Sequence, residues 1–400
     1  MKPRLLIILN RLVVGGQSID TVPLAKHLQQ QYDIMIVYGE KENDEEAYTD
    51  ISENTAGIVF NKIPSLKRSV NPLNDVAAFY ALYKCIKKFN PSVVHTHGSK
   101  PGFTGRLSAW FAGVPVIIHT FHGHLFHSYY NKIFSFIIIR FERLLGRLST
   151  KVVVLSTQQK LEITSQYKIV DPEKAAVIPL GIDEEIFTVN SLLFRETFRK
   201  QYLLNEGDVA VGIIGRMVPV KNHKLFIDII IALELLINNK TRFFIIGDGD
   251  LKNELQLRLN NARINWSETG KNPAAKVIFT SWVTPITTVL HGLDIVVLTS
   301  LNEGTPLSII EAQICGKPVV AANTGGVRDT LIDNESGFLI SGYNAAQYAD
   351  KLKLLIESKD LQINMGIKAR NFAKEKFSRQ TEVDAFINLY ANCIRETSNN

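Results

Sequence analysis

Short apolar runs rich in Val and Ile alternate along the chain with segments of helical period, and this alternation limits the fold more than any other feature. Near-continuous runs of this kind are typical of strands buried on both faces, and helical connections between them imply parallel pairing. The runs span residues 4–10, 33–39, 58–63, 92–98, 116–123 and 151–156 in the first half, and 209–215, 242–247, 276–282, 294–300 and 318–324 in the second. The sequence therefore predicts an α/β protein with two doubly wound, Rossmann-like sheets.

The length of 400 residues also favours two domains, because a single hydrophobic core rarely grows so large. The stretch IPLGIDEEIF, residues 178–187, is the predicted linker, since Pro179 and Gly181 interrupt regular structure. We predict one Rossmann-like domain over residues 1–185, a second over 186–377, and a C-terminal helix over 378–400 that packs back on the first domain. Doubly wound domains bind ligands at the carboxyl ends of their strands, so we expect two crevices that face each other across a cleft.

Positive charge is concentrated in the first half of the chain. The net charge is +6, and residues 51–150 hold 12 Lys and Arg against three acids. Such a block favours an anionic partner such as a phosphate ester, an acidic lipid headgroup or a nucleic acid. Within it, residues 133–148 read as an amphipathic helix that is too interrupted by charge to cross a bilayer. This helix either packs on the sheet alone or also touches acidic lipid.

The cysteines and the N-terminus point to a cytoplasmic protein. Cys85, Cys315 and Cys393 lie far apart without a CxxC spacing, which predicts unbridged thiols in a reducing compartment. The first residues hold an apolar run of only five residues. A run that short does not make a signal peptide, so we expect a buried first strand there.

In the first half, the candidates for chemistry are a glycine pair and a group of histidines. Gly15 and Gly16 follow the first strand and precede a helix, where free backbone N–H groups can hold a phosphate. Six histidines lie within 33 residues: His95, His97, His119, His122, His124 and His127. A zinc site would need histidines alone, because no Asp, Glu or Cys occurs between residues 86 and 141. We expect at least one imidazole near HTFHGH to face the cleft and to bond a sugar hydroxyl or a phosphate.

In the second half, two strand ends carry polar groups. Arg216 and Lys221 follow the strand that ends at Gly215, a position where two cations can neutralise a diphosphate. The next strand leads into Asp248-Gly249-Asp250, which imitates a DxD metal motif. A turn made by Gly247 and Gly249, with Asp250 capping the following helix, is the favoured interpretation, and we predict no metal site.

The stretch EGTPLSIIEA, residues 303–312, sets two carboxylates on either side of a turn. Glu303 follows a buried strand and so lies at the edge where ligands bind. Gly304 lets the backbone approach a ligand, Thr305 is expected to cap the next helix, and Pro306 suits its first position. Glu311, inside that helix, can offer two oxygens to a vicinal diol such as a ribose, while Glu303 is placed to meet another polyol.

With these motifs the chain resembles the retaining glycosyltransferases of the GT-B fold, specifically glycosyltransferase family 4. The resemblance rests on the E-x7-E spacing of Glu303 and Glu311, on GRMVPVKN, on FFIIGDGDLKNEL and on the glycine loop in LNRLVVGGQSIDTVPLAKHL. It covers nearly the whole chain and is closest over residues 209–340.

The resemblance implies a role for each motif. Arg216 and Lys221 would bind the donor diphosphate, Glu311 the ribose, and Glu303 the transferred sugar, with His122 near the reactive centre. The other donor-binding residues that it implies are Gly16, Gly247, Trp282, Val283, Gly304, Thr305, Pro306 and Leu307. The implied reaction moves a sugar from a nucleoside diphosphate sugar, with a UDP-sugar favoured, and retains the anomeric configuration without an obligatory metal or other cofactor.

The expected acceptor is a glycan or a polyprenyl-linked glycan in surface polysaccharide assembly, which adds the inner membrane face as a candidate contact. Gln17-Ser18, where many members carry an acid, and the long segment 260–274 leave donor and acceptor identity open. A UDP-sugar 2-epimerase shares the architecture, but it would be expected to carry catalytic acids in the first half, where none occurs from 76 to 141. A nucleic-acid-binding protein is the distant alternative, and it lacks a recognisable binding signature, so we expect no nucleic acid partner.

Overall fold

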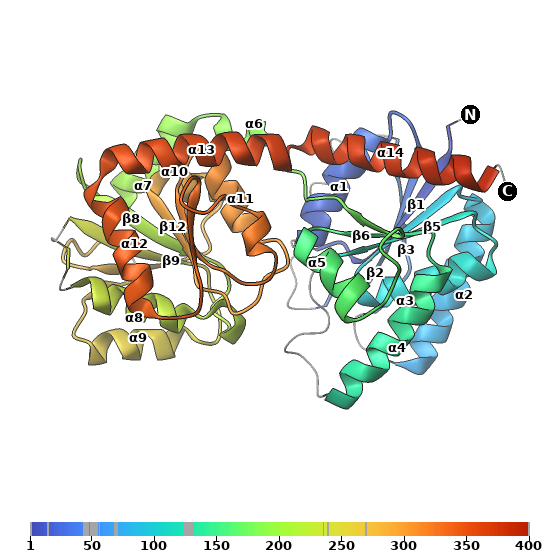
Figure 1. Cartoon of the computed structure of the whole chain (residues 1–400), viewed down its shortest axis with the longest axis horizontal. Helices are drawn as coiled ribbons and strands as arrows, with labels where there is room; N and C mark the ends of the chain where they lie inside the picture. The colour runs from blue at the N-terminus through green and yellow to red at the C-terminus, as the bar shows by residue number, and fades with distance from the viewer. Residues whose placement is uncertain are drawn as a thin grey trace. The chain divides into compact units, whose positions relative to one another are not determined.

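The chain divides into two compact units in this computed structural model (Figure 1). Unit 1 consists of residues 1–181 and 379–400, and unit 2 of residues 182–378. The structure describes residues 2–13, 16–42, 48, 55, 57–67, 71–122, 132–234, 236–237, 240–268 and 270–398, with the side chains of 16, 132–134 and 398 left out. The division after Gly181 falls inside the stretch 178–187, a few residues before the boundary that the sequence placed at 185.

Among the described residues, unit 1 contains a parallel sheet of seven strands in the order β3-β2-β1-β4-β5-β6-β7. The strands are β1 (Arg4–Arg11), β2 (Asp33–Gly39), β3 (Val59–Lys62), β4 (Val93–His97), β5 (Val116–Phe121), β6 (Lys151–Val154) and β7 (Ala175–Val177). The helices are α1 (Gly16–Leu28), α2 (Pro72–Phe89), α3 (Ser99–Phe111), α4 (Lys132–Leu148), α5 (Thr157–Leu161), a π-helical turn (Glu162–Gln166) and α14 (Arg379–Ser398). The strand order reverses between β1 and β4, and such a switch point is where open α/β sheets bind ligands.

Unit 2 repeats this plan, with a described sheet of seven parallel strands in the order β10-β11-β9-β8-β12-β13-β14. The strands are β8 (Val209–Ile214), β9 (Thr241–Ile246), β10 (Trp266–Ser267), β11 (Val277–Ser281), β12 (Ile295–Leu298), β13 (Val319–Ala322) and β14 (Gly337–Ile340). The α-helices are α6 (Glu184–Thr188), α7 (Ser191–Gln201), α8 (His223–Glu234), α9 (Lys252–Asn261), α10 (Ile286–Gly292), α11 (Leu307–Ile314), α12 (Ala345–Glu357) and α13 (Lys359–Phe377). Here the switch point lies between β8 and β12.

Both faces of the unit 2 sheet are covered by helices (Figure 1). Side chains alternate across β9, so that Phe243 joins the core beneath α8, α9 and α12, whereas Phe244 joins the core beneath α7, α10 and α11. This double burial explains why the strands read as unbroken apolar runs in the sequence. The predicted α/β class with two doubly wound parallel sheets is confirmed.

The C-terminal helix α14 belongs to unit 1. Its Phe386 and Tyr390 are buried in the core formed by β1, β4 and β5, and the hydroxyl of Tyr390 lies 2.7 Å from Nδ1 of His95. At the start of the helix, the buried Arg379 donates to the carboxylates of Asp20 on α1 and of Glu382. The last helix is therefore an integral part of the first unit's core.

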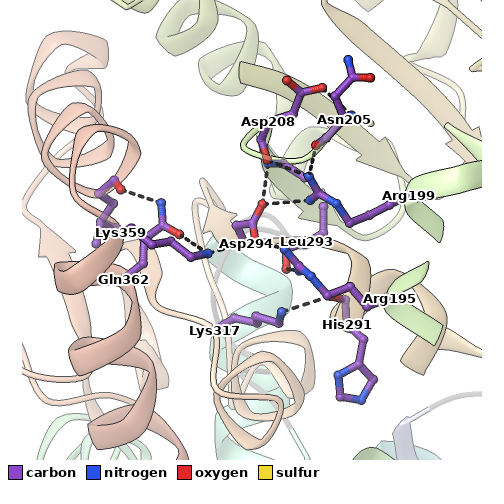
Figure 2. Close-up of polar contacts among 12 residues, drawn as sticks. Arg195, Arg199, Asn205, Asp208, His291, Leu293, Asp294, Lys317, Lys359 and Gln362 are labelled. Atoms are coloured by element: carbon purple, nitrogen blue, oxygen red, sulfur yellow. Dashed lines mark hydrogen bonds and ion pairs between the residues drawn. The ribbon is translucent and has the colours of Figure 1, made fainter. Parts of the chain in front are cut away.

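A charged network clamps helix α7 to the amino ends of β8 and β12 (Figure 2). Asp294, the residue before β12, accepts a hydrogen bond from Nη2 of Arg195 at 2.8 Å, and its other oxygen accepts the N–H of Ala210 at 2.9 Å and Nη1 of Arg199 at 3.3 Å. Burial by itself would raise the pKa of Asp294, but Arg195, the N–H of Ala210 and Lys317 together lower it below its usual value. The network lies at the sheet edge opposite the strand ends that bind ligands.

We expect Asp294→Asn to destabilise unit 2 by about 3 kcal/mol, because it leaves Arg195 and Arg199 without their buried counter-charge. For a unit of this size, that loss lowers the melting temperature by roughly 6–12 °C. Since the pKa of Asp294 is lowered in the folded state, its contribution is present above the unfolded pKa of about 3.9 and is lost as the pH falls. Melting curves from about pH 8 to about pH 3 should therefore show the two proteins converging at the acid end. A variant of an exposed ion pair, Glu357→Gln, serves as the control, and an equal loss in both would contradict the prediction.

Candidate functional site

The carboxyl ends of β8, β12 and β13 lie side by side at the switch point of unit 2, and each continues into a polar segment. Thr299, directly after β12, links two of these segments, because its Oγ1 donates to the carbonyls of Lys221 and Asn222 at 3.0 Å each. The N–H of Leu301 donates to the carbonyl of Val220 at 2.8 Å. The segment with Lys221 and the segment with Glu303 are therefore joined through their backbones.

Glu303 is held at this edge by two donors. Nζ of Lys221 lies 2.5 Å from Oε1 of Glu303, and Oγ of the buried Ser300 donates to the same oxygen at 2.7 Å. Oε2 accepts no hydrogen bond from the residues that the structure describes. The carboxylate therefore has a fixed orientation and one oxygen available for a ligand.

The backbone of Glu303 is fixed by the turn after β13. The N–H of Gly326 donates to the carbonyl of Glu303 at 3.0 Å. Gly325 has φ +49°, and a Cβ there would come within 2.1 Å of the same carbonyl oxygen. Only a glycine allows this close approach. The turn after β13 thus positions the acid that follows β12.

Helix α11 carries Glu311, and burial raises the pKa of this carboxyl group to about 7.

The prediction that Thr305 caps the helix is wrong, because Pro306 occupies the N-cap position and Leu307 is the first helical residue. The helix begins one residue later than expected, which leaves Oγ1 of Thr305 buried without a hydrogen-bond partner in the described structure. A hydroxyl in that state is suited to meet a ligand atom.

The turn after β9 packs against the segment that carries Arg216. Gly247 has φ +131°, and a Cβ there would come within 2.2 Å of the carbonyl oxygen of Gly215. Oδ1 of Asp248 accepts the N–H of Gly249 at 2.8 Å, and Oδ2 accepts Oγ of Ser281 at 3.3 Å. The prediction that Asp250 caps α9 is wrong, since Leu251 is the N-cap residue and no side chain caps the helix.

Arg216 and Trp282 are the exposed members of this group. The guanidinium of Arg216 forms no hydrogen bond or ion pair with the described residues. Trp282 is 56% exposed, whereas the neighbouring Val283 packs on the core beneath α10 and α11. The two exposed side chains are thus available to a ligand at this edge.

In unit 1, the predicted residues lie at the carboxyl ends of β1 and β5. Gly16 is the first residue of α1, and Gly15 lies outside the described residues. His122 directly follows β5 and is half-buried, and its Nε2 lies 2.8 Å from Nδ1 of His97. Burial lowers the pKa of His122, and Asp20 of α1 offsets part of this effect.

The other described histidines of the group are core residues. His95 contacts Tyr390 through Nδ1 and Thr120 through Nε2, both at 2.7 Å, and burial lowers its pKa to about 3. His119 contacts Thr96 at 2.9 Å, and burial lowers its pKa as well. His124 and His127 lie outside the described residues. Within the described part of the chain, no group of three or more His, Cys, Asp or Glu side chains is arranged to hold a metal ion.

The comparisons with known proteins agree along both units. Residues 14–186 match the family described as glycosyltransferase family 4, and residues 194–372 match the glycosyl transferases group 1. The UDP-Gal:α-D-GlcNAc-diphosphoundecaprenol α-1,3-galactosyltransferase of Escherichia coli is 31% identical over 389 residues, which cover 96% of this chain and 95% of that protein. The chain belongs to glycosyltransferase family 4.

Two further similarities extend this result. The poly(ribitol-phosphate) α-N-acetylglucosaminyltransferase of Staphylococcus aureus is 28% identical over 361 residues, which cover 87% of this chain and 65% of that protein. The structure of HepE from Anabaena in complex with UDP has the same fold, with a TM-score of 0.80 and 18% identity over 97% of this chain and all of that chain. This family 4 member is therefore a GT-B protein and a hexosyltransferase-type enzyme, which decides against the epimerase alternative.

The sequence of this family 4 glycosyltransferase led to the two acids, the cations and the group of histidines, but not to the contacts that orient them. Ser300, Gly325 and His97 owe their contacts to neighbouring strands that are far away in sequence. A signal was present for the first two, because Ser300 ends the apolar run 294–300 just before Glu303, and Gly325 directly follows the apolar run 318–324.

We expect Ser300→Ala to lower kcat by roughly 3- to 10-fold, because the loss of one hydrogen bond frees the Glu303 carboxylate to rotate. Steady-state kinetics with the preferred donor measures the effect. Ser191→Ala on α7 is the matched control and should leave kcat unchanged. Full activity of Ser300→Ala, with an unchanged melting temperature, would mean that Lys221 alone orients Glu303.

Proposed function

We propose that this glycosyltransferase moves a hexose from a UDP-sugar to a lipid-linked or polymeric glycan in surface polysaccharide assembly, with retention of anomeric configuration. The observation that carries the proposal is the similarity, along nearly the whole chain, to an Escherichia coli enzyme named for a UDP-Gal donor and a diphosphoundecaprenol-linked acceptor. The UDP bound to the structurally similar HepE supports the choice of nucleotide.

The donor diphosphate is assigned to Arg216 and Lys221. The guanidinium of Arg216 is exposed, and Lys221 lies at the end of a short 3-10 helix next to the same strand end. Two cations at this edge can offset the two negative charges of a diphosphate and the further charge that develops on it as the sugar departs. Lys221 pairs with Glu303, so a bound diphosphate would share this cation with the carboxylate.

The remaining donor groups follow from the same edge. Glu311 is assigned to the ribose, Glu303 to the transferred sugar, and Trp282 with Val283 to the base. Gly247, Gly304, Thr305, Pro306 and Leu307 complete the proposed donor site. In unit 1, Gly16 is assigned to the phosphates and acceptor, and His122 to the reactive centre.

The experiment that tests the function offers the purified enzyme a panel of UDP-hexoses and UDP-N-acetylhexosamines together with a polyprenyl-diphosphate-linked N-acetylglucosamine. We expect one donor to protect the enzyme against thermal unfolding and to give a product with an α linkage, measured by NMR of the anomeric proton. A β linkage from an α-linked donor would overturn retention. Inversion at C2 of the donor without any acceptor would overturn the transferase reaction itself.

The two acids should separate in kinetics. Glu311→Gln should mainly raise the donor KM, because a ribose contact acts equally in the ground state and in the transition state. A charge-assisted hydrogen bond contributes about 1.5–3 kcal/mol, which corresponds to a roughly 10- to 150-fold loss in kcat/KM. Glu303→Gln should instead lower kcat, because positive charge builds on the sugar as its bond to phosphate breaks.

The pKa of Glu311 adds a pH signature to this prediction. Because burial raises that pKa to about 7, the carboxylate that accepts the ribose hydroxyls forms as the pH rises. The donor KM of the wild type should therefore fall from about pH 6 to about pH 8, and Glu311→Gln should lose this dependence. Melting curves control for folding, and identical kinetic defects in both folded variants would contradict the division of roles.

Transfer should not require a divalent metal, because Arg216 and Lys221 supply the positive charge at the diphosphate. We expect activity to persist in excess chelator. Arg216→Ala and Lys221→Ala should each lose about 10- to 100-fold in kcat/KM under the same conditions. Activity that disappears in chelator and returns with Mn²⁺ or Mg²⁺ would contradict this and would favour Asp248 and Asp250 as metal ligands.

An exposed aromatic surface on unit 1 supports contact with a membrane. Helices α2, α3 and α4 pack side by side, and seven large side chains on them are 39–59% exposed. We call Tyr80, Phe103, Trp110, Phe111, Phe136, Phe141 and Leu144 the aromatic surface. The rings of Phe103 and Phe141 pack edge to face with their centroids 6.0 Å apart. The guanidinium carbon of Arg140 lies 5.1 Å from the ring centroid of Phe136.

Aromatic side chains with adjacent arginines suit the boundary between headgroups and acyl chains of an anionic bilayer. In the described residues, no helix is long and apolar enough to cross a membrane. We therefore propose that the enzyme lies on the inner membrane face through the aromatic surface and so reaches a lipid-linked acceptor.

The enzyme should sediment with anionic vesicles at low salt and be released as salt rises. The double variant Phe136→Ser/Phe141→Ser should bind these vesicles at least about 10-fold more weakly, because two apolar anchors are removed. The control is Leu192→Ser/Leu193→Ser on α7, which also removes exposed apolar side chains, 75% and 59% exposed. Equal binding to neutral and anionic vesicles, or binding to neither, would contradict a lipid-facing role.

A further inference from the structure

The imidazole of His97 contacts His122 directly at the carboxyl edge of the unit 1 sheet. The two residues follow from neighbouring parallel strands, with His97 at the end of β4 opposite Thr120 of β5. Nδ1 of His97 lies 2.8 Å from Nε2 of His122, and the ring centroids are 5.1 Å apart. His97 is 1% exposed, whereas His122 is half-buried. The buried ring of His97 therefore contacts the more exposed ring of His122 from inside the fold.

Burial of this pair favours the neutral form of both rings. Burial, together with His95, His122 and His119, lowers the pKa of His97, and burial lowers that of His122 despite Asp20. One proton lies between the two nitrogens, and its position decides the tautomer of both residues. Nε2 of His97 is buried and has no hydrogen-bond partner in the described structure.

That unpartnered nitrogen indicates where the shared proton lies. If His122 donated the proton, His97 would carry its own proton on Nε2, as a buried N–H without an acceptor. Buried N–H groups without an acceptor are rare in folded proteins. The alternative places the proton on Nδ1 of His97 and leaves Nε2 as a bare lone pair. His122 then accepts at Nε2 and carries its own proton on Nδ1, which has no partner among the described residues.

We propose that His97 is a positioning residue that holds His122 in one ring orientation and in the Nδ1–H tautomer, so that His122 presents an N–H donor to the reactants. The proposal rests on the assignment of His122 to the reactive centre. The matching ligand chemistry is an oxygen acceptor, either a hydroxyl of the transferred sugar or an oxygen of the departing phosphate. His97 itself acts only through His122.

Two substitutions at residue 97 separate this role from simple packing. The amide of an asparagine occupies about the position of Nδ1 of a histidine and can still donate to His122. The amide of a glutamine reaches instead to the position of Nε2, where no partner exists. Asn therefore keeps the contact, and Gln removes it while leaving a polar side chain in the same space.

The kinetic test compares His97→Asn and His97→Gln in the full-length enzyme, with melting curves for both. We expect His97→Asn to keep kcat within about 3-fold of the wild type and His97→Gln to lose about 10-fold, with little change in the donor KM. In a His122→Ala background, His97→Gln should cause no further loss, because His97 acts only through that ring. Equal activity of the two variants, or an additive loss in the double variant, would overturn the proposal.

The tautomer is measured independently of activity by long-range ¹H–¹⁵N NMR of the enzyme labelled on histidine, with His122→Ala to assign the signals. We expect a single Nδ1–H tautomer at His122 in the wild type and in His97→Asn, but a mixture in His97→Gln. An Nε2–H tautomer in the wild type would overturn the assignment of the proton. If no UDP-sugar is a substrate, the proposed function fails, but the NMR measurement still reports the tautomer of His122 and its dependence on His97.

Discussion

A parallel sheet with helices on both faces leaves only its two rows of strand ends for charged groups. In unit 2 the amino and carboxyl ends of the strands have different roles. At the amino ends of the strands, both oxygens of Asp294 accept hydrogen bonds, from Arg195, Arg199 and the N–H of Ala210. This carboxylate therefore holds α7 to the sheet. At the carboxyl row, Oε2 of Glu303 and the guanidinium of Arg216 find no partner among the described residues. Asp294 therefore stabilises the fold, whereas Glu303 and Arg216 keep polar atoms that can bind a ligand.

The unsaturated edge depends on close backbone contacts that join separate strand ends. Thr299 ties the end of β12 to the segment of Lys221, and Gly325 lets the turn after β13 meet the carbonyl of Glu303. Lys221 and Glu303 are thereby each held by a contact from a neighbouring strand end. Because such contacts require little movement when a ligand arrives, they pre-organise the charges that the transition state needs.

The sequence was informative where burial alone decides structure and uninformative where tertiary contacts decide it. Long Val and Ile runs identified most strands, but β7, β10 and β14 have only two to four residues and lack that signal. The caps predicted for Thr305 and Asp250 were wrong, because each helix starts later than its local residues suggest. The acids of the E-x7-E spacing could be located, whereas Ser300 and His97 bind partners that only the folded sheet brings near.

The absence of acids from residues 76–141 also shapes unit 1. Arg106 on α3 is fully buried and must find its counter-charge elsewhere, and it finds Glu142 on α4, with Nη2 and Oε2 2.6 Å apart. A buried arginine without that acid would cost several kcal/mol, so α4 cannot rotate away from this contact. Phe141 and Leu144 on the same helix are about half exposed, and the ring of Phe141 also contacts Phe103 of α3. The ion pair therefore joins α3 and α4, which together carry most of the aromatic surface, and it links the basic block of the sequence to the proposed membrane contact.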